Sequence, residues 1–106
     1  MAGKLARDKK ANGICILDLR KLSPVADYFV ICTADADVHA WAVADFITEQ
    51  LKGKGIAAWH IEGRGATGWV VIDYIDVIVH IFLAPVREHY SLERLWGDAP
   101  KTAIAD

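Results

Sequence analysis

Apolar runs separated by short polar or glycine-containing segments divide this chain into a regular series of elements. Runs of about four to eight apolar residues, rich in valine and isoleucine, are typical of buried β-strands. The chain contains such runs at residues 14–19, 27–33, 57–61, 69–73 and 76–83. The last two runs follow each other so closely that they predict a hairpin, which turns across Tyr74 and Ile75.

Helical spacing of the apolar residues begins at Asp37. One stripe of that helix is apolar and consists of Ala40, Val43, Ala44, Ile47 and Leu51. Glycines follow the stripe, and glycine favours the end of a helix. A shorter helical segment follows Pro85, at residues 86–96, with a polar tail behind it. Residues 2–11 are short and charged, so we expect them to form a frayed helix.

The order of these elements predicts the fold class. A strand, a helix and a further strand in succession predict one right-handed parallel crossover, and the two flanking hairpins add antiparallel edges. The expected class is therefore α/β, with a single mixed five-stranded sheet flanked by helices. A chain of 106 residues is long enough for one core, so residues 1–106 are expected to form a single domain.

The composition is that of a folded domain, with 54% hydrophobic and 25% charged residues. No apolar run reaches the roughly 18 residues that a membrane span needs. The first ten residues are basic but have no apolar stretch behind them, which argues against a secretory signal. Cys15 and Cys32 lie inside apolar runs, so two reduced, buried thiols in a cytoplasmic protein are expected rather than a disulfide framework.

The charge is distributed unevenly along the chain. Residues 1–21 hold six Lys or Arg and two Asp, whereas residues 22–106 hold six basic and twelve acidic side chains. An acidic body argues against a general nucleic-acid binder, and no sequence-specific contact with nucleic acid is expected. It suits a basic protein partner, because opposite fields favour encounter, although many ordinary soluble proteins share this balance.

Two aspartates before the long helix, Asp35 and Asp37, suggest a metal site, because carboxylates two residues apart can bridge divalent cations. The sequence offers neither a third carboxylate at suitable spacing nor a phosphate-binding loop. Aspartates at such a position more often cap the free N–H groups of a helix start and favour its dipole. We therefore expect capping, with no metal and no other cofactor.

The four histidines, His39, His60, His80 and His89, do not have the spacing of a zinc site. His80 could be a general base, but no nucleophile motif accompanies it, so a structural or interface role is expected. Residues 63–68 read G-x-G-x-x-G, yet they precede a strand rather than a helix. That segment predicts a loop and not a phosphate cradle.

The last third of the chain is rich in aromatic residues and arginine, which are over-represented at binding hot spots. These residues and their apolar neighbours are Phe82, Arg87, Tyr90, Leu92, Leu95 and Trp96. The alternative is that a C-terminal helix packs the same side chains onto the sheet. Composition leaves the two interpretations open.

Six segments stand out as a set: ILDLR at 16–20, ADYFVI at 26–31, IEG at 61–63, GWVVIDY at 68–74, VHIF at 79–82 and REHYSLERLWGDA at 87–99. In order and spacing they resemble the Iojap-like ribosomal silencing factor family, over residues 10–99. The tyrosine, Leu-Glu and Leu-Trp that follow the His-x-Phe strand are specific to that family. The resemblance therefore covers nearly the whole chain.

The resemblance implies a nucleotidyltransferase-like fold without the catalytic carboxylates of those enzymes, and hence a binding protein rather than an enzyme. Members of the family dock on the large ribosomal subunit, on its fourteenth protein, and block joining of the small subunit. Repression of translation is therefore implied. Many members look like homodimers, so a homodimer or higher assembly is also expected.

The matching motifs also imply which residues bind the partner. An apolar and aromatic centre would exclude water, while the carboxylates of Asp73, Asp76 and Glu93 would pair with Lys or Arg of the ribosomal protein. The full set of expected partner-binding residues is Trp69, Asp73, Asp76, His80, Phe82, Arg87, Tyr90, Leu92, Glu93 and Trp96.

Two stretches depart from the family pattern. Ile75 stands where members usually have glycine, and isoleucine is a poor occupant if that turn needs a positive φ. Trp41 lies about 100° from the core stripe of its helix, with Val38 and Ala42 farther round, which predicts an apolar patch on the wet face. The alternative function is therefore self-assembly, in a divergent or engineered family member, through an added surface around Trp41 and Ile75.

Overall fold

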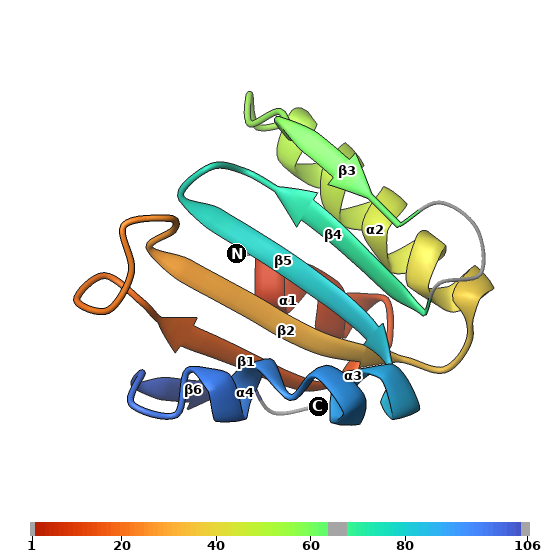
Figure 1. The fold of residues 1–106 in the computed structure, drawn as a ribbon. Helices are drawn as coiled ribbons and strands as arrows, with labels where there is room; N and C mark the ends of the chain where they lie inside the picture. The colour runs from red at the N-terminus through yellow and green to blue at the C-terminus, as the bar shows by residue number, and fades with distance from the viewer. Residues whose placement is uncertain (1, 64–67, 105–106) are drawn as a thin grey trace.

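The structure, a computed structural model, describes residues 2–63 and 68–104. Figure 1 shows its elements in chain order. They are α1 (Ala2–Asp8), β1 (Asn12–Asp18), β2 (Tyr28–Ala34), α2 (Asp37–Lys52), β3 (His60–Glu62), β4 (Trp69–Asp73), β5 (Val77–Leu83), α3 (Ala84–Tyr90), α4 (Leu92–Leu95) and β6 (Lys101–Ala103). The five strands and the long helix predicted from the apolar pattern all overlap an element of the structure.

A six-stranded sheet forms the centre of the molecule, in the order β3-β4-β5-β2-β1-β6 (Figure 1). β2 and β5 are parallel, with Val30 opposite Val79, and the other neighbouring strands are antiparallel. This arrangement arises because β3, β4 and β5 form a meander whose last strand lies next to β2. The α/β class and the mixed sheet are confirmed.

The sheet has six strands rather than the expected five, because the polar tail adds β6. This strand pairs with β1, with Thr102 opposite Ile16. All three residues of β6 are exposed. Backbone hydrogen bonds rather than burial hold this edge of the sheet, among them the bond that Ile104 N–H donates to the carbonyl of Ile14 over 3.0 Å. A strand of this kind leaves no apolar pattern in the sequence.

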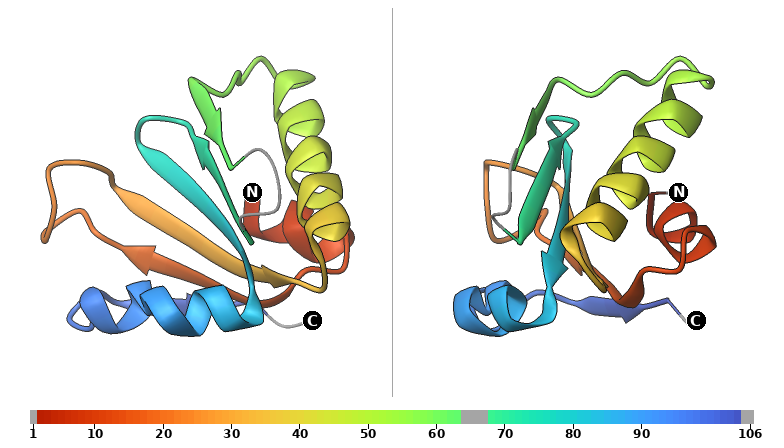
Figure 2. Two further views of the ribbon diagram at one scale, coloured as in Figure 1. Left: turned by 45° about the vertical axis from the view of Figure 1, so that its right-hand side comes forward. Right: turned by 90° about the vertical axis from the view of Figure 1, so that its right-hand side faces the viewer.

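The helices form a layer on each side of the sheet (Figure 2). α1 and α2 cover one face and enclose the larger core, to which the sheet contributes Val30, Cys32, Ile72, Val79 and Ile81. α3 and α4 lie on the opposite side, beside β1 and β2. The smaller core beneath them consists of Leu17, Leu19, Ile31, Phe82 and Ala99.

α1 is a docked helix, which corrects the expectation that residues 2–11 fray. Ala2, Gly3 and Ala6 are buried, and Ala6 has no exposed surface. They pack α1 against α2 and β1. Small side chains allow this close approach, so the helix is buried without the large apolar residues that a sequence pattern detects.

The stripe predicted for α2 is confirmed, since its five members are the buried residues of that helix. Trp41, however, is half-buried and packs against the larger core. The expectation that it lies on the wet face is therefore wrong. Val38 and Ala42 are exposed, as their position on the helix predicts.

The start of α2 has no side-chain cap, which corrects the role expected of Asp35 and Asp37. Ala36 occupies the N-cap position in extended conformation. Asp37 lies in the first turn, where a carboxylate favours the helix dipole. Its Oδ1 accepts a hydrogen bond from Gly68 N–H over 3.2 Å, so this carboxylate ties the helix start to the beginning of β4.

The connection between β4 and β5 is the tight turn predicted across Tyr74 and Ile75. Ile75 has a φ of +74°, the positive value for which a β-branched residue is a poor occupant. The loop predicted at residues 63–68 falls mostly outside the described residues, because 64–67 are not described. None of the described helices is long and apolar enough to cross a membrane.

Candidate functional site

The sheet face that carries α3 and α4 is covered over only part of its width. Leu17 and Phe82, which lie beneath the two helices, are fully buried. Val71, Asp73 and Ile78 point to the same side of the sheet farther toward β3, and all three remain half-buried. Figure 1 looks onto this open part of the face. We take it as the candidate binding site.

Five aromatic rings form a line across this face, from the end of α3 to the residue that follows α4: Tyr90, Trp69, His80, Phe29 and Trp96. Centroid distances along the line are 4.6 Å for Tyr90–Trp69, 5.8 Å for Trp69–His80, 4.6 Å for His80–Phe29 and 6.1 Å for Phe29–Trp96. We call these five residues the aromatic face. Tyr90 is 51% exposed, while Trp69, Phe29 and Trp96 are half-buried. Rings at these separations stabilise one another and present a rigid surface.

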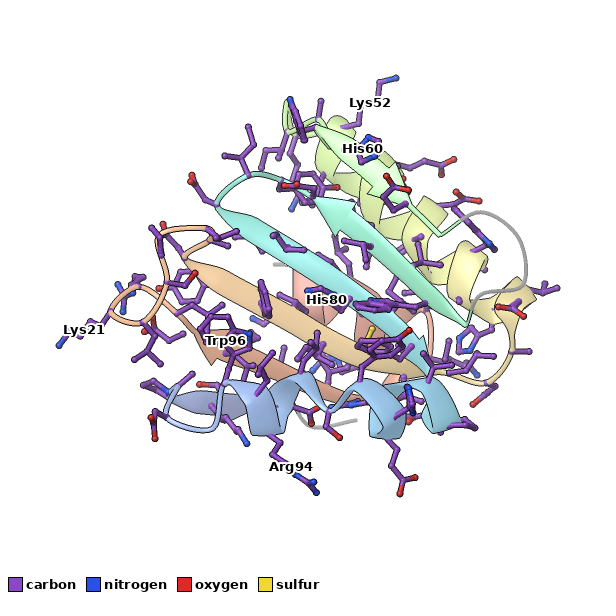
Figure 3. All side chains as sticks on the ribbon, viewed as in Figure 1. Lys21, Lys52, His60, His80, Arg94 and Trp96 are labelled. Atoms are coloured by element: carbon purple, nitrogen blue, oxygen red, sulfur yellow. The ribbon has the colours of Figure 1, made fainter. Side chains whose placement is uncertain are left out.

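His80 is the buried centre of the aromatic face, in the middle of the sheet (Figure 3). Its Nδ1 accepts a hydrogen bond from the indole N–H of Trp69 over 3.1 Å. Burial lowers the pKa of His80 to about 4, so the ring is neutral at pH 7 and its proton lies on Nε2. The histidine therefore orients the indole of Trp69 within the surface.

Arg87 fixes α3 and α4 against the sheet. Its Nη1 donates to the carbonyl of Gly13 over 2.7 Å and to Oγ1 of Thr33 over 2.8 Å. Its Nε and Nη2 donate to the two carboxylate oxygens of Glu93 over 3.1 and 3.0 Å. Ser91 separates the two helices at a φ of 47°. Since Arg87 belongs to α3 and Glu93 to α4, this single side chain ties both helices to β1 and β2.

Four of the ten residues expected to bind a partner have other roles. Phe82 has no exposed surface, so it is a core residue and not a contact. Arg87 and Glu93 bind each other, so the Glu93 carboxylate already has a cationic partner within the chain, and its role at the rim of a contact stays a prediction. Leu92 packs against the smaller core. The sequence does not distinguish these residues from surface residues, because their burial depends on where α3 and α4 lie on the sheet.

The other six expected residues lie on or beside the open face. Four of them, Trp69, His80, Tyr90 and Trp96, belong to the aromatic face, and Trp96 also packs against the smaller core. The remaining two are at the β4–β5 turn. The Asp73 carboxylate accepts a hydrogen bond from Ile75 N–H over 2.7 Å and so stabilises that turn. The side chain of Asp76 is exposed.

The four residues expected to form a self-association surface are not brought together. Val38, Trp41 and Ala42 lie in the first turns of α2, in the layer behind the sheet (Figure 1). Ile75 lies at the β4–β5 turn, at the other end of the molecule. The sequence-based interpretation joined three apolar positions off the core stripe of α2 with Ile75, because both stretches depart from the family pattern.

Sequence reasoning missed several residues of the open face. Phe29 and Ile78 lie opposite each other in the parallel pair of β2 and β5, on the open side. Trp59 precedes β3 and is 70% exposed. The available signal is period-two alternation, since Phe29 shares a face with Ile31, but a continuous apolar run predicts a buried strand and does not reveal that part of one face is open.

The remaining histidines have structural or surface positions. Nδ1 of His39 accepts a hydrogen bond from Asp35 N–H over 3.0 Å, and its Nε2 lies 2.7 Å from the carbonyl of Lys9. This ring therefore links the end of α1 to the start of α2. His60 is exposed and pairs with Glu62 on β3. Within the described ranges no group of three or more His, Cys, Asp or Glu is arranged to hold a metal ion.

The two cysteines are free thiols on the neighbouring strands β1 and β2. Cys32 is fully buried in the larger core, and burial raises its pKa to about 12. Cys15 is half-buried, and its pKa is raised mainly by burial and also by the nearby Glu93. A raised thiol pKa disfavours the nucleophilic thiolate, so neither residue has the character of a catalytic cysteine.

The structure is an α/β domain whose mixed sheet presents a line of partly exposed rings on one half-open face. The comparison with protein families matches residues 1–106 to the family described as "Ribosomal silencing factor during starvation". The chain belongs to this family. Its members are named as silencing factors of the ribosome, so the role is regulatory, ribosome-associated and not enzymatic.

Individual relatives agree with this assignment. The ribosomal silencing factor of Bacillus subtilis is 42% identical over 100 residues, which cover 94% of this chain and 85% of the relative. The mouse protein "Mitochondrial assembly of ribosomal large subunit protein 1" is 30% identical over 91% of this chain and 43% of its own length. A crystal structure from Chromobacterium violaceum matches with a TM-score of 0.87 at 30% identity, over 99% of this chain and 88% of that one.

Proposed function

We propose that this protein represses translation by binding the large ribosomal subunit, on its fourteenth protein, and sterically blocking the small subunit from joining. The observation that carries the proposal is the aromatic face, in a chain that belongs to the ribosomal silencing factor family. The aromatic face is the centre of the contact. Repression then needs no chemistry on the ribosome, because an occupied joining surface is unavailable to the small subunit.

The physical character of the aromatic face supports a protein contact. Tyrosine and tryptophan are enriched at binding hot spots, because a large rigid ring buries much apolar area with little loss of side-chain entropy. Tyr90 offers the most exposed ring of the five. Since Arg87 fixes both helices, the rings of Tyr90 and Trp96 are held in place before a partner binds, which lowers the cost of association.

The charge of the chain supports a basic partner. Residues 22–106 carry an excess of acidic side chains, and Asp73 and Asp76 lie at the border of the open face. Opposite charge on a ribosomal protein would accelerate encounter and orient the two surfaces. The name of the mouse relative, which refers to assembly of the ribosomal large subunit, supports that subunit as the target.

Sedimentation through a sucrose gradient tests the proposal directly. The purified protein is mixed with isolated large ribosomal subunits at low and moderate salt, and small subunits are then added. We expect the protein to migrate with the large subunit and to reduce the amount of joined ribosomes. Tyr90→Ala should weaken binding by about tenfold or more, because it removes an exposed hot-spot ring.

The control variant is Ile56→Ala, which shortens an exposed apolar side chain on the helix-covered side of the molecule. It should bind the large subunit as the unchanged protein does, and circular dichroism should show the same fold for both variants. A protein that sediments without the large subunit, or that leaves subunit joining unaffected, would contradict the proposal.

A further inference from the structure

The end of the sheet at which β4 turns into β5 carries three strongly exposed apolar side chains. Val25, Trp59 and Ile75 are 72%, 70% and 59% exposed and come from three separate segments of the chain. Together with Ile78 they line a depression of about 400 Å³, with Asp73 in its wall. We call Val25, Trp59, Ile75 and Ile78 the turn patch. Exposed apolar groups that cluster in this way mark interaction sites more often than scattered ones do.

Hydrogen bonds hold the segments of the turn patch together. Trp59 N–H donates to the carbonyl of Asp73 over 2.8 Å, and Asp27 N–H donates to the carbonyl of Asp76 over 2.7 Å. Within the turn, the Asp73 carboxylate accepts the bond from Ile75 N–H. The patch is thereby ordered before any partner binds, so little conformational entropy is lost on association.

Ile75 adopts a backbone conformation that isoleucine disfavours. Its φ of +74° lies in the left-handed region that β-branched residues rarely adopt and that glycine adopts readily. Its side chain is mostly exposed, so the fold gains little apolar burial from it. A strained residue that contributes little to the fold points to a contact made outside the chain.

Carboxylates border the turn patch. Asp27, Asp73 and Asp76 lie on its segments, and none of the three forms an ion pair with a residue of the described ranges. Lys21, on the same loop as Val25, points outward from that loop (Figure 3). An apolar centre with an acidic rim complements a protein surface on which an apolar side chain is surrounded by Lys or Arg.

We propose that the turn patch is a second docking surface, whose occupant is an apolar side chain with a basic surround on the ribosomal protein partner. This inference rests on the proposed ribosome binding and extends that contact beyond the aromatic face. The two surfaces are continuous, because Ile78 lies opposite Phe29 in the sheet. A second copy of this chain fits the patch poorly, since a two-fold interface would bring the carboxylates of both copies together.

Binding of the purified variants to isolated large ribosomal subunits tests the inference. Trp59→Ala and Ile75→Gly should each weaken binding by about tenfold or more. Ile75→Gly is the sharper variant, because it relieves the backbone and a loss of binding cannot then be attributed to unfolding. Asp76→Lys should also weaken binding, and its effect should shrink as salt is raised.

The variants at Ile75 and Asp76 have matched controls on the helix-covered side. Ile56→Ala controls for the loss of an exposed isoleucine, and Asp45→Lys controls for the change of charge. If the turn-patch variants bind like the unchanged protein while Tyr90→Ala fails to bind, the inference is wrong and the proposed function stands. If the unchanged protein does not bind the subunit, the proposed function falls and this inference with it. If the variants alter the oligomeric state in analytical ultracentrifugation, the occupant is a second copy and the inference is overturned.

Discussion

The indole N–H of Trp69 donates a hydrogen bond to Nδ1 of His80 over 3.1 Å, at the centre of the aromatic face. This bond requires a neutral imidazole, because a protonated Nδ1 would present a second donor to the indole. Nε2 of His80 is buried and has no hydrogen-bond partner among the described residues. The imidazolium would therefore lack both solvation and an acceptor, which is the physical reason that burial holds the pKa of His80 at about 4.

The first prediction follows from that pKa. An unfolded histidine titrates near pH 6.5, so between pH 6.5 and 4 the unfolded chain binds a proton that the folded chain does not. The contribution of His80 to stability is therefore fully present above pH 6.5 and is lost as the pH falls toward 4. The loss amounts to about 3 kcal/mol at most. Urea unfolding at several pH values in this window measures it.

His80→Gln is the matching control, because glutamine keeps a polar side chain but does not titrate. Its unfolding free energy should decline less steeply between pH 6.5 and 4 than that of the unchanged protein. The remaining slope then belongs to groups other than His80. Identical slopes for the two proteins would show that His80 is not held neutral by the fold.

The second prediction concerns Arg87, the clamp that positions Tyr90 at the end of α3 and Trp96 directly after α4. Arg87→Lys keeps the positive charge but cannot reach Gly13, Thr33 and Glu93 at once, because only the guanidinium carries donors in a planar fork. We expect a loss of about 1–3 kcal/mol in the free energy of unfolding. Urea unfolding curves provide the measurement.

Arg94→Lys controls for the same chemical change at a site without the clamp. The Arg94 side chain is exposed and points away from the sheet (Figure 3). Its replacement should alter stability by less than about 0.5 kcal/mol. Equal stability of the two variants would mean that Arg87 does not hold the helices.

The third prediction tests the docking of α1. Ala6 of α1 is fully buried in the larger core, where α1 packs against α2 and the sheet. Ala6→Leu therefore forces extra methyl and methylene groups into filled space. Such overpacking costs about 1–3 kcal/mol. Lys4→Leu places the same side chain at an exposed position of the helix and should have little effect. Thermal unfolding that does not distinguish the two variants would indicate a frayed helix.

Large apolar residues made most of the fold predictable. The runs of valine and isoleucine indicated five strands, and the stripe of α2 indicated the face that the structure buries. The positive φ of Ile75 was also foreseeable from the short hairpin. By contrast, α1 docks through alanine and glycine, and β6 is held by backbone hydrogen bonds. Neither kind of contact produces a regular spacing of large apolar residues in the sequence.

The candidate site was predictable in its residue types but not in their roles. Phe82 and Tyr90 belong to the same aromatic-rich segment, yet one is fully buried and the other half-exposed. Arginine is a residue type that is common at binding sites, yet Arg87 acts as a clamp within the fold. These roles depend on where α3 and α4 cross the sheet, which is a tertiary property. Trp59 is held beside this surface by the hydrogen bond that its backbone N–H donates to the carbonyl of Asp73, a contact between segments that the sequence does not show.

The fourth prediction is that Ile75→Gly stabilises the fold. A non-glycine residue in the left-handed region costs about 1–2 kcal/mol, whereas glycine adds about 0.5–1 kcal/mol of entropy cost from the unfolded chain. The net gain should be up to about 1 kcal/mol, which raises the thermal midpoint by about 4–8 °C at most for a domain of this size.

Ile75→Ala separates strain from exposure in the same measurement. Alanine removes most of the exposed apolar surface but keeps the Cβ that disfavours a positive φ. It should therefore fail to reproduce the gain of the glycine variant. A thermal midpoint that rises equally for both variants would mean that apolar exposure, and not backbone strain, limits stability at this turn. Of the two variants, only the glycine variant should combine a more stable fold with weaker binding. That combination would mean that isoleucine, which costs the fold stability at a φ of +74°, makes a contact outside the chain.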